Sequence, residues 1–356
     1  MDFEVRRTDL RQHRIVNDPV PDPMDGQVVL RVDHAALTAN NITYGAFGEL
    51  MGYWRFFPAA DGWGRVPVWG FADVISSRAK GVEIGERVYG YFPMSTHLVV
   101  EPGRVSATTF VDVSEHRASL PPVYNQYLRL EGRVFGHTSE RGEQIQAVFR
   151  PLFTTSFLID DWLASEQMFG ATSVVIASAS SKTALGLAAL LSANRDVEVV
   201  GLTSAANAEF VGSVGYYDRV VVYGEVAALD ASRPTVLVDM GGNAAVVAEV
   251  HTHFGDALLH SCQVGATHWE HVRFGVEVPG PTPTLFFAPD HVVRRSAEWG
   301  APAFEERVRL ALDVFIASVD TWLELVVHRG PDAVAAAFIE VLEGRVPPRQ
   351  AFIISL

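Results

Sequence analysis

The sequence predicts a two-domain α/β protein, and three observations support this prediction. The chain has 356 residues, which is long for one hydrophobic core, and apolar residues make up 48% of it. Short β-branched runs separated by turn signals fill residues 1 to about 150. After Pro151, apolar runs alternate with helical segments. This alternation is typical of a parallel sheet that helices cover on both faces.

The first 150 residues predict a small barrel or sandwich. β-branched runs occupy residues 27–37 and 65–77, and residues 86–102 predict two short strands around a turn at Phe92-Pro93. Glycines and prolines recur between these runs. Short strands at this spacing are typical of antiparallel sheets that close or pack in two layers.

The remainder of the chain predicts crossover units and then a helical region. The expected strands lie at residues 174–178, 197–204, 219–224, 235–242, 257–262 and 284–289. The first of them leads into a helix at 182–194 that is apolar on most of its sides, which indicates burial against the sheet. We then expect a long amphipathic helix at 304–328, a helix at 332–344 and a final strand before residue 356.

The composition of the chain argues against several kinds of partner and site. The net charge of -14 argues against partners that are nucleic acids or anionic membrane surfaces. Cys262 is the only cysteine, which excludes a disulfide framework and a cysteine-rich zinc site. The charged start of the chain shows no signal peptide, and apolar stretches such as 184–191 are too short to span a bilayer. We therefore expect a cytoplasmic protein.

The turn after the strand at 174–178, which reads Ser-Ala-Ser-Ser-Lys-Thr, is the main candidate for a phosphate site. It copies only the end of the triphosphate-binding pattern GxxxxGK[ST] and lacks both glycines, which argues against that pattern. A dinucleotide pattern stays open, because small residues let a pyrophosphate approach, and the hydroxyls, Lys182 and the helix N-terminus can bind it. The alternative is that the serines only cap the helix.

The end of the next strand favours NADP(H) over NAD(H). An acid usually meets the free ribose 2′-hydroxyl at this place, but residues 201–207 contain no carboxylate. Thr203, Ser204 and Asn207 would tolerate and bind a 2′-phosphate, and Lys182 is our candidate for the cation that the phosphate needs.

Several segments in order along the chain carry a resemblance to a known family. The first set comprises residues 37–41, 67–71, 81–90, 154–159, 236–242 and 344–352. A second set, which carries a closer resemblance, comprises SASSKTA, residues 201–207, Tyr217-Asp-Arg-Val and Thr267-His-Trp269. This pattern resembles the medium-chain dehydrogenase/reductase superfamily, in its zinc-free, quinone-oxidoreductase-like branch. The more detailed segments are most similar to a bacterial family of uncharacterised function within that branch.

The resemblance implies an architecture and a set of roles. Residues 1–150 would form a GroES-like substrate and catalytic domain, and 151–310 a Rossmann domain with a doubly wound parallel sheet. The C-terminal helices and strand at 311–356 would return to the first domain. Asn41 would lie near the nicotinamide, and the cysteine that binds catalytic zinc in related alcohol dehydrogenases is absent near 37–41. Relatives are often dimers, so a homodimer is expected.

We therefore predict an NADPH-dependent, zinc-free oxidoreductase that reduces an apolar carbonyl or enone, a small-molecule substrate. The alternative is a non-catalytic binding module that has lost the dinucleotide. The catalytic candidates are Asn41, Tyr44 and His268, and the substrate-pocket candidates are Trp54, Tyr124 and Trp269, with packed aromatic cores as the other interpretation of the rings. The cofactor candidates are Thr155, Ser178, Ala179, Ser180, Ser181, Lys182, Thr183, Thr203, Ser204, Asn207, Tyr223, Met240, Gly241 and Gly242. No metal site is expected, since His251 and His253 would point apart on a helix.

Overall fold

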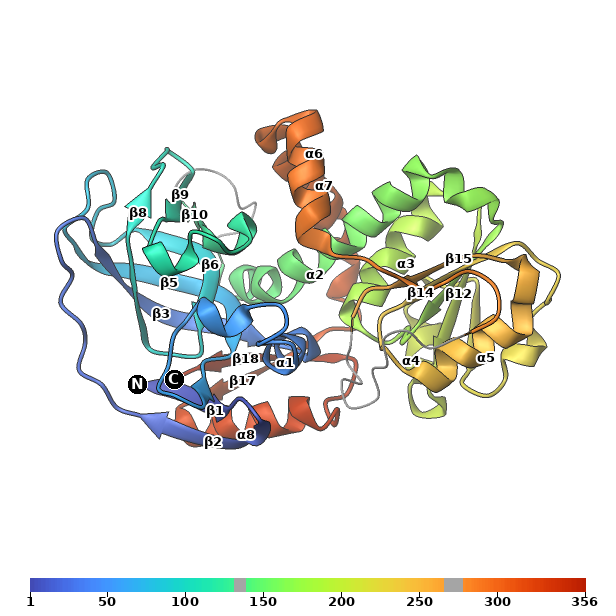
Figure 1. Ribbon diagram of the computed structural model, residues 1–356, viewed down its shortest axis with the longest axis horizontal. Helices are drawn as coiled ribbons and strands as arrows, with labels where there is room; N and C mark the ends of the chain where they lie inside the picture. The colour runs from blue at the N-terminus through green and yellow to red at the C-terminus, as the bar shows by residue number, and fades with distance from the viewer. Residues whose placement is uncertain (131–138, 266–277) are drawn as a thin grey trace. The chain divides into compact units, whose positions relative to one another are not determined.

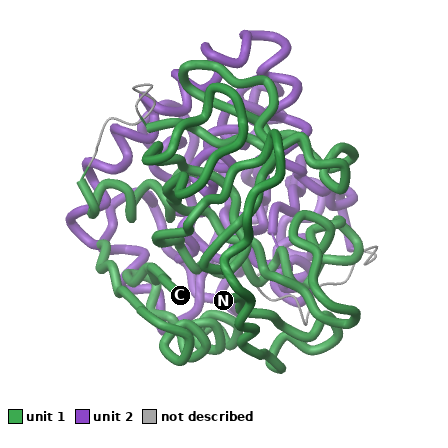
Figure 2. Tube along the Cα trace, turned by 90° about the vertical axis from the view of Figure 1, so that its left-hand side faces the viewer, with its two compact units in different colours: residues 1–150, 323–356 green, residues 151–322 purple. Residues whose placement is uncertain are grey.

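The computed structural model describes residues 1–130, 139–265 and 278–356, which form two compact units. Unit 1 comprises Met1–Arg150 and Leu323–Leu356, and unit 2 comprises Pro151–Trp322 (Figure 2). The boundary between residues 150 and 151 falls inside helix α2 (Glu140–Ser165), which the sequence pattern did not predict. The predicted α/β class, with one β-rich part and one parallel sheet, is confirmed.

Unit 1 is built on sheets that are antiparallel except for one parallel pair at an edge, and the candidate residues of the first domain lie on α1 and on short helical turns between the strands. Among the described residues, the larger sheet has the order β17-β18-β3-β5-β6-β10-β9-β8, with β7 also paired to β3 (Figure 1). Its strands are β3 (Val28–Leu37), β5 (Pro67–Ser77), β6 (Arg87–Pro93), β7 (His97–Val100), β8 (Pro102–Gly103), β9 (Thr109–Asp112), β10 (Gln126–Arg129), β17 (Glu324–Arg329) and β18 (Gln350–Ser355). A smaller sheet pairs β1 (Asp2–Arg6) with β2 (Asp9–Val16) and β4 (Trp63–Gly64).

The predicted turn at Phe92-Pro93 is wrong. β6 continues through Pro93, which pairs with Pro67 at the start of β5, and the chain reverses over residues 94–96 before β7 begins. Proline has no N–H to donate, so it is tolerated at the end of a strand, where the hydrogen-bonded ladder stops.

Unit 2 is a parallel sheet with helices on both faces. Among the described residues, the strand order is β13-β12-β11-β14-β15-β16 (Figure 1). The strands are β11 (Ser173–Ala177), β12 (Glu198–Thr203), β13 (Arg219–Val222), β14 (Thr235–Asp239), β15 (Leu258–Gln263) and β16 (Thr284–Leu285). The connecting helices are α3 (Lys182–Asn194), α4 (Ala208–Ser213) and α5 (Ala244–Phe254). Alternate residues of β11 enter separate cores, Val174 and Ile176 on one side and Val175 and Ala177 on the other. That double burial explains the continuously apolar run.

Two predicted elements near the C-terminus are wrong in extent. The strand expected at 284–289 is only two residues long, because α6 (Ala288–Trp299) begins with Pro289 in its first turn. The helix expected at 304–328 is α7 (Ala301–Val319), and the following 324–329 segment is β17, which pairs in parallel with β18. The β-branched Val326 and Val327 suit that pairing. The helix at 332–344 is confirmed as α8 (Pro331–Leu342).

None of the described helices combines the length and the apolar character that crossing a bilayer requires.

Candidate functional site

The carboxyl edge of the unit 2 sheet contains a topological switch point. From β11 the chain proceeds to β12 and β13 on one side of the sheet, and then to β14 and β15 on the other. In open parallel sheets, ligands bind outside the carboxyl ends of the strands at such a point. The turn at 178–181, which joins β11 to α3, leaves the sheet there.

The turn has a tight backbone although it lacks glycine. Ser178 adopts a φ of 56°, in the left-handed region that favours glycine. The Ser181 N–H donates to the Ser178 carbonyl oxygen at 2.9 Å and closes the turn. Ser181 is the N-cap of α3, since its Oγ accepts the Ala184 N–H at 3.2 Å. One serine of the turn is therefore a helix cap.

Two tyrosines from neighbouring segments hold this backbone. The Tyr223 hydroxyl accepts the Ser178 N–H at 3.1 Å and lies 3.3 Å from Ser178 Oγ. The Tyr217 hydroxyl donates to the Ala179 carbonyl at 2.8 Å. A Cβ added to Gly201 would lie 2.9 Å from the Tyr217 ring, so glycine lets that ring pack beside the turn. The role of Tyr217 was missed by the sequence analysis, which quoted the residue only as part of a motif.

The loop after β12 also reaches the turn. Asn207 Nδ2 donates to Ser180 Oγ at 3.0 Å, which brings together two predicted cofactor residues. Thr203 is buried at the end of β12, and its carbonyl accepts the Tyr223 N–H at 2.8 Å. Ser204 precedes the short helix at 205–207, and its carbonyl accepts the Asn207 N–H at 3.0 Å.

The N-terminus of α3 presents a cation and rests on α2. Lys182 is the first helical residue and is partly buried, and this desolvation lowers its pKa to about 8. Ser156 Oγ of α2 donates to the Thr183 carbonyl at 2.7 Å. The predicted Thr155 instead bonds back to the carbonyl of Pro151. Ser156, one residue further along the same helix, was not among the residues predicted from the sequence.

The connection after β14 is closed by a buried acid. The Asp239 carboxylate accepts the N–H groups of Gly241 at 2.9 Å and Gly242 at 3.0 Å. Burial raises the pKa of Asp239 to about 6, and the two N–H groups partly oppose that shift. The Met240 N–H donates to the carbonyl of Ala177, the last residue of β11, at 3.3 Å. These predicted residues therefore lie beside the turn, with the glycine amides already bonded within the fold.

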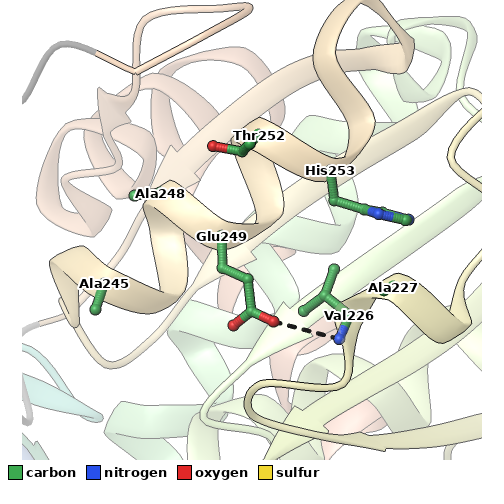
Figure 3. A pocket seen from close by; sticks show the side chains of 7 residues that line it. All are labelled: Val226, Ala227, Ala245, Ala248, Glu249, Thr252 and His253. Carbon is green, nitrogen blue, oxygen red and sulfur yellow. Dashed lines mark hydrogen bonds between the residues drawn. The ribbon is translucent and has the colours of Figure 1, made fainter.

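A shallow hollow on unit 2 lies elsewhere and is lined by none of the predicted residues (Figure 3). Its lining residues are Val226, Ala227, Ala245, Ala248, Glu249, Thr252 and His253. Its carboxylate is already used, because Glu249 of α5 accepts the N–H groups of Gly224 and Val226, both at 3.3 Å. Figure 3 shows the bond to Val226. Glu249 thereby holds the turn that follows Tyr223. We place the candidate site at the switch point rather than in this hollow, because the donors gather there.

In unit 1, the side-chain amide of Asn41 makes hydrogen bonds to the backbone of neighbouring segments. It is buried, its Oδ1 accepts the Thr38 N–H at 2.7 Å, and its Nδ2 donates to the Pro67 carbonyl at 2.8 Å. These bonds tie the start of α1 (Ala39–Ala46) to the start of β5. Trp54 packs against Gly48 and Gly64, where an added Cβ would lie 2.2 and 2.4 Å from its ring. Trp54 therefore has a packing role in unit 1.

Tyr44 and Tyr124 belong to one aromatic cluster of unit 1. The Tyr44 oxygen accepts N–H groups from Asn40 at 2.8 Å and from Trp69 at 3.3 Å. The Tyr124 hydroxyl lies 3.4 Å from that of Tyr53. The other two candidates, His268 and Trp269, lie outside the described residues.

One group with metal-ligand chemistry occurs in the described part of unit 1. Ligand atoms of Asp33, His34 and Glu143 lie within 4.8 Å of one another. The Arg87 guanidinium contacts Asp33 at 2.7 Å and also binds Glu143 and Asp73. A protein cation therefore already pairs with these carboxylates, as in an ion-pair network. In unit 2, His251 bonds to Pro279 and Ser261, whereas His253 bonds to Leu229.

Solved structures share the fold at low sequence identity. CurA from Vibrio vulnificus in complex with NADPH has a TM-score of 0.65 and 13% identity, over 99% of this chain and 96% of that one. Mycobacterial Rv1454c complexed with NADPH has a TM-score of 0.57 and 12% identity, over 100% and 99%. Galactitol-1-phosphate dehydrogenase from Escherichia coli has a TM-score of 0.55 and 12% identity, over 99% of each chain. At this identity the likeness establishes the fold and not the substrate.

One sequence family matches most of the chain. No curated protein matches the chain. The family described as "Protein of unknown function (DUF2855)" matches residues 35–347. The predicted architecture, with a GroES-like and a Rossmann domain, is confirmed by the two units and their structural neighbours. The chain therefore belongs to the DUF2855 family and has the fold of the medium-chain dehydrogenases/reductases.

Proposed function

We propose that the protein is an NADPH-dependent, zinc-free oxidoreductase that reduces an apolar carbonyl or enone. The arrangement of donors at the N-terminus of α3 is the observation that carries the proposal. Two structural neighbours are complexes with NADPH, which supports the choice of cofactor. The substrate is proposed to be a small molecule, and the homodimer, the cytoplasmic location and the absence of nucleic-acid and membrane partners stay predictions.

The hydroxyls of the turn are arranged to donate hydrogen bonds. Ser181 Oγ accepts the Ala184 N–H, and Ser180 Oγ accepts from Asn207 Nδ2. Each oxygen accepts one hydrogen bond from a group of the fold, and its own proton can still be donated to another acceptor. Phosphate oxygens are strong acceptors, and the N–H groups of the first helical turn add further donors.

Lys182 places its ammonium group where two effects disfavour a positive charge. The helix dipole is positive at an N-terminus and opposes an ammonium group there, and burial opposes it as well. The chain has 28 lysines and arginines, of which only Lys80 and Lys182 are lysines. A phosphate at the turn would offset both costs. The absence of a carboxylate from residues 201–207 favours the 2′-phosphate of NADPH.

A titration of nucleotide fluorescence tests the proposal. We expect the purified chain to change the emission of NADPH, with NADH bound more weakly. Lys182→Ala should raise the Kd for NADPH about 10- to 100-fold, since a charged hydrogen bond contributes about 1.5–3 kcal/mol. The effect on NADH should be smaller.

Lys80→Ala is the matched control, because Lys80 is the other lysine and is exposed in unit 1. It should leave both affinities unchanged. Equal losses of NADPH and NADH affinity in Lys182→Ala would remove the assigned role of Lys182 toward the 2′-phosphate. No emission change with either nucleotide would contradict the reductase.

A specific observation favours the second candidate function, a non-catalytic binding module. The N–H of Ser178 is taken by Tyr223, and those of Gly241 and Gly242 are taken by Asp239. Three backbone donors beside the turn are therefore used by the fold itself. A wild-type chain that leaves the emission of both nucleotides unchanged would favour this function.

A further inference from the structure

Five aromatic rings from different segments of unit 2 meet around Trp162 of α2. The centroid of its ring lies 5.4 Å from that of Phe169, 5.3 Å from His260, 5.5 Å from Phe286 and 6.2 Å from His291. Phe169 belongs to the turn at 167–170, His260 to β15, Phe286 to the link before α6, and His291 to α6. We call these five residues the Trp162 cluster. It joins α2, the turn and α6 to β15.

Both histidines of the cluster are packed as flat rings. His260 stacks on Phe169 with the centroids 4.1 Å apart and the planes at 6°, and His291 stacks on Phe286 at 4.1 Å and 17°. The Trp162 ring crosses the two imidazoles at 72° and 66°. Each imidazole is half-buried. Rings this close exclude water from one face of each imidazole, so the neutral form packs there at a lower cost than the charged form.

The turn beside His260 has a strained backbone. Gln167, Met168 and Phe169 adopt φ values of 52°, 54° and 55°, in the left-handed region that residues with a Cβ seldom adopt. Such strain persists only where the surrounding structure holds it. Met168 is buried in the core of the sheet, and the stack of Phe169 on His260 ties the end of the turn to β15. Loss of that stack would let the turn relax.

We propose that the Trp162 cluster is a pH-sensitive switch, which holds α6 and the turn at 167–170 on the sheet while both imidazoles are neutral and releases them when the imidazoles gain protons. Protonation would place two positive charges among apolar rings, and the release of the strained turn would favour the same change. The switch goes beyond the proposed function, because it requires neither a nucleotide nor a substrate.

The surroundings of His260 favour its neutral form. Its Nε2 lies 3.1 Å from Thr284 Oγ1 of β16, a hydroxyl that can bond to either form of the ring. Burial lowers the pKa of His260, and the charge of Glu166, which precedes the turn, opposes this shift without reversing it. A cation stacked on a phenyl ring also gains some attraction, but this gain is small where the site is half-exposed.

His291 is surrounded by charges of both signs. Burial is the largest cause that lowers its pKa, and Arg294 and Arg295 of α6 lower it further. Asp290 of α6 and Asp161 of α2 raise it. Asp161 is paired with Arg295, so the effects of this acid and this cation oppose each other. The net direction again favours the neutral ring.

The pH range of the switch follows from the two lowered pKa values. Above the ordinary pKa of 6.5, both imidazoles are neutral in the closed and in the open state, so the closed state keeps its full stability. As the pH falls below 6.5, the open state binds protons more readily than the closed state, and the closed state loses stability. At one pH unit below 6.5, each imidazole favours opening by up to about 10-fold, and the two together by up to about 100-fold.

Hydrogen exchange of the full chain without nucleotide tests the switch, because it measures local opening segment by segment. Protection factors are compared at pH 7.5 and 5.5, after correction for the intrinsic exchange rate at each pH. We expect protection of residues 166–171 and 286–299 to fall about 10- to 100-fold at pH 5.5. At that pH both segments should also exchange faster than α3, since opening of the cluster leaves the rest of the sheet folded.

The double variant His260→Phe/His291→Phe keeps two stacking rings and cannot gain these protons. Its protection in both segments should change less than about twofold between the two pH values. His13→Phe is the matched control, because His13 also stacks on a phenylalanine ring, Phe3, at 5.3 Å, but lies in unit 1. It should keep the full wild-type fall. Circular dichroism checks the folding of each variant, and each single variant should keep a fall of up to about 10-fold.

Three results would overturn the inference. The first is unchanged protection of both segments in the wild type, and the second is an undiminished fall in the cluster variants. The third is equal protection of the segments and α3 at pH 5.5, which would mean that acid unfolds unit 2 as a whole. The reductase is tested separately, so a chain that binds no nucleotide but shows the selective fall would retain the switch.

Discussion

Ser178 holds a backbone conformation that residues other than glycine seldom adopt. Its φ of 56° costs a residue with a Cβ about 1–2 kcal/mol. The Tyr223 hydroxyl, which accepts its N–H, and the Ser181 N–H, which donates to its carbonyl, hold it in place. A serine with tertiary partners thus stands where dinucleotide folds use glycine, and it adds a hydroxyl to the turn.

The strain at Ser178 can be measured with two substitutions that remove the same hydroxyl. Ser178→Gly should be more stable than Ser178→Ala by about 1 kcal/mol, because only glycine adopts this φ without strain. Urea unfolding of both variants gives the difference. A Ser178→Ala variant as stable as Ser178→Gly would show that the turn relaxes away from positive φ.

At the scale of an element, the connection from β14 to α5 depends on one carboxylate. Asp239 ends β14 beside Ala177 of β11, and it bonds to both glycine amides of the connection. Its pKa of about 6 in the folded protein exceeds its ordinary value of 3.8, because burial disfavours the charge. Protonation therefore favours the folded state. This stabilisation is complete below pH 3.8 and is lost as the pH rises through about 6.

Asp239→Asn should remove this pH dependence, because asparagine resembles the protonated acid and does not titrate. Between pH 4 and 7, the free energy of unfolding of the wild type should fall by about 2–3 kcal/mol relative to the variant. The opposite effect of His251, whose pKa burial lowers, is present in both proteins and cancels. Parallel stability profiles from urea unfolding at each pH would refute the role of Asp239.

At the scale of the whole molecule, long-range and local electrostatics act in opposite directions on an anionic cofactor. The net charge of -14 repels NADPH at a distance, while Lys182 and the helix N-terminus attract it at contact. Salt screens the long-range repulsion first, since the Debye length falls from about 30 Å at 0.01 M to about 8 Å at 0.15 M.

The association rate of NADPH should therefore rise at least about twofold between 0.01 and 0.15 M salt. Stopped-flow fluorescence measures this rate. A rate that falls over the same range would mean that a positive field surrounds the site, contrary to the acidic composition.

Much of the fold was predictable because its signals are local. The apolar strands before and after Lys182 and the helix at 182–194 follow from burial on both faces of a sheet. The extended helix prediction failed beyond Val319, since helical spacing alone does not reveal that 324–329 finds a strand partner in β18. The position of the candidate turn was likewise predictable, because the turn lies between a strand and a helix that both have clear local signals.

The sequence by itself determined the strand-turn-helix at residues 173–194, its hydroxyls and lysine, and the absence of an acid after β12, because these are properties of neighbouring residues. Only the tertiary structure decided which groups these side chains meet. Asn207 and Ser180 are 27 residues apart, and Tyr223 and Ser178 are 45 apart, so strand pairing must bring them together before they can bond. The aromatic rings of unit 1 likewise converge only once the sheet has formed, and no spacing in the chain records that the Tyr91 hydroxyl has no hydrogen-bond partner among the described residues.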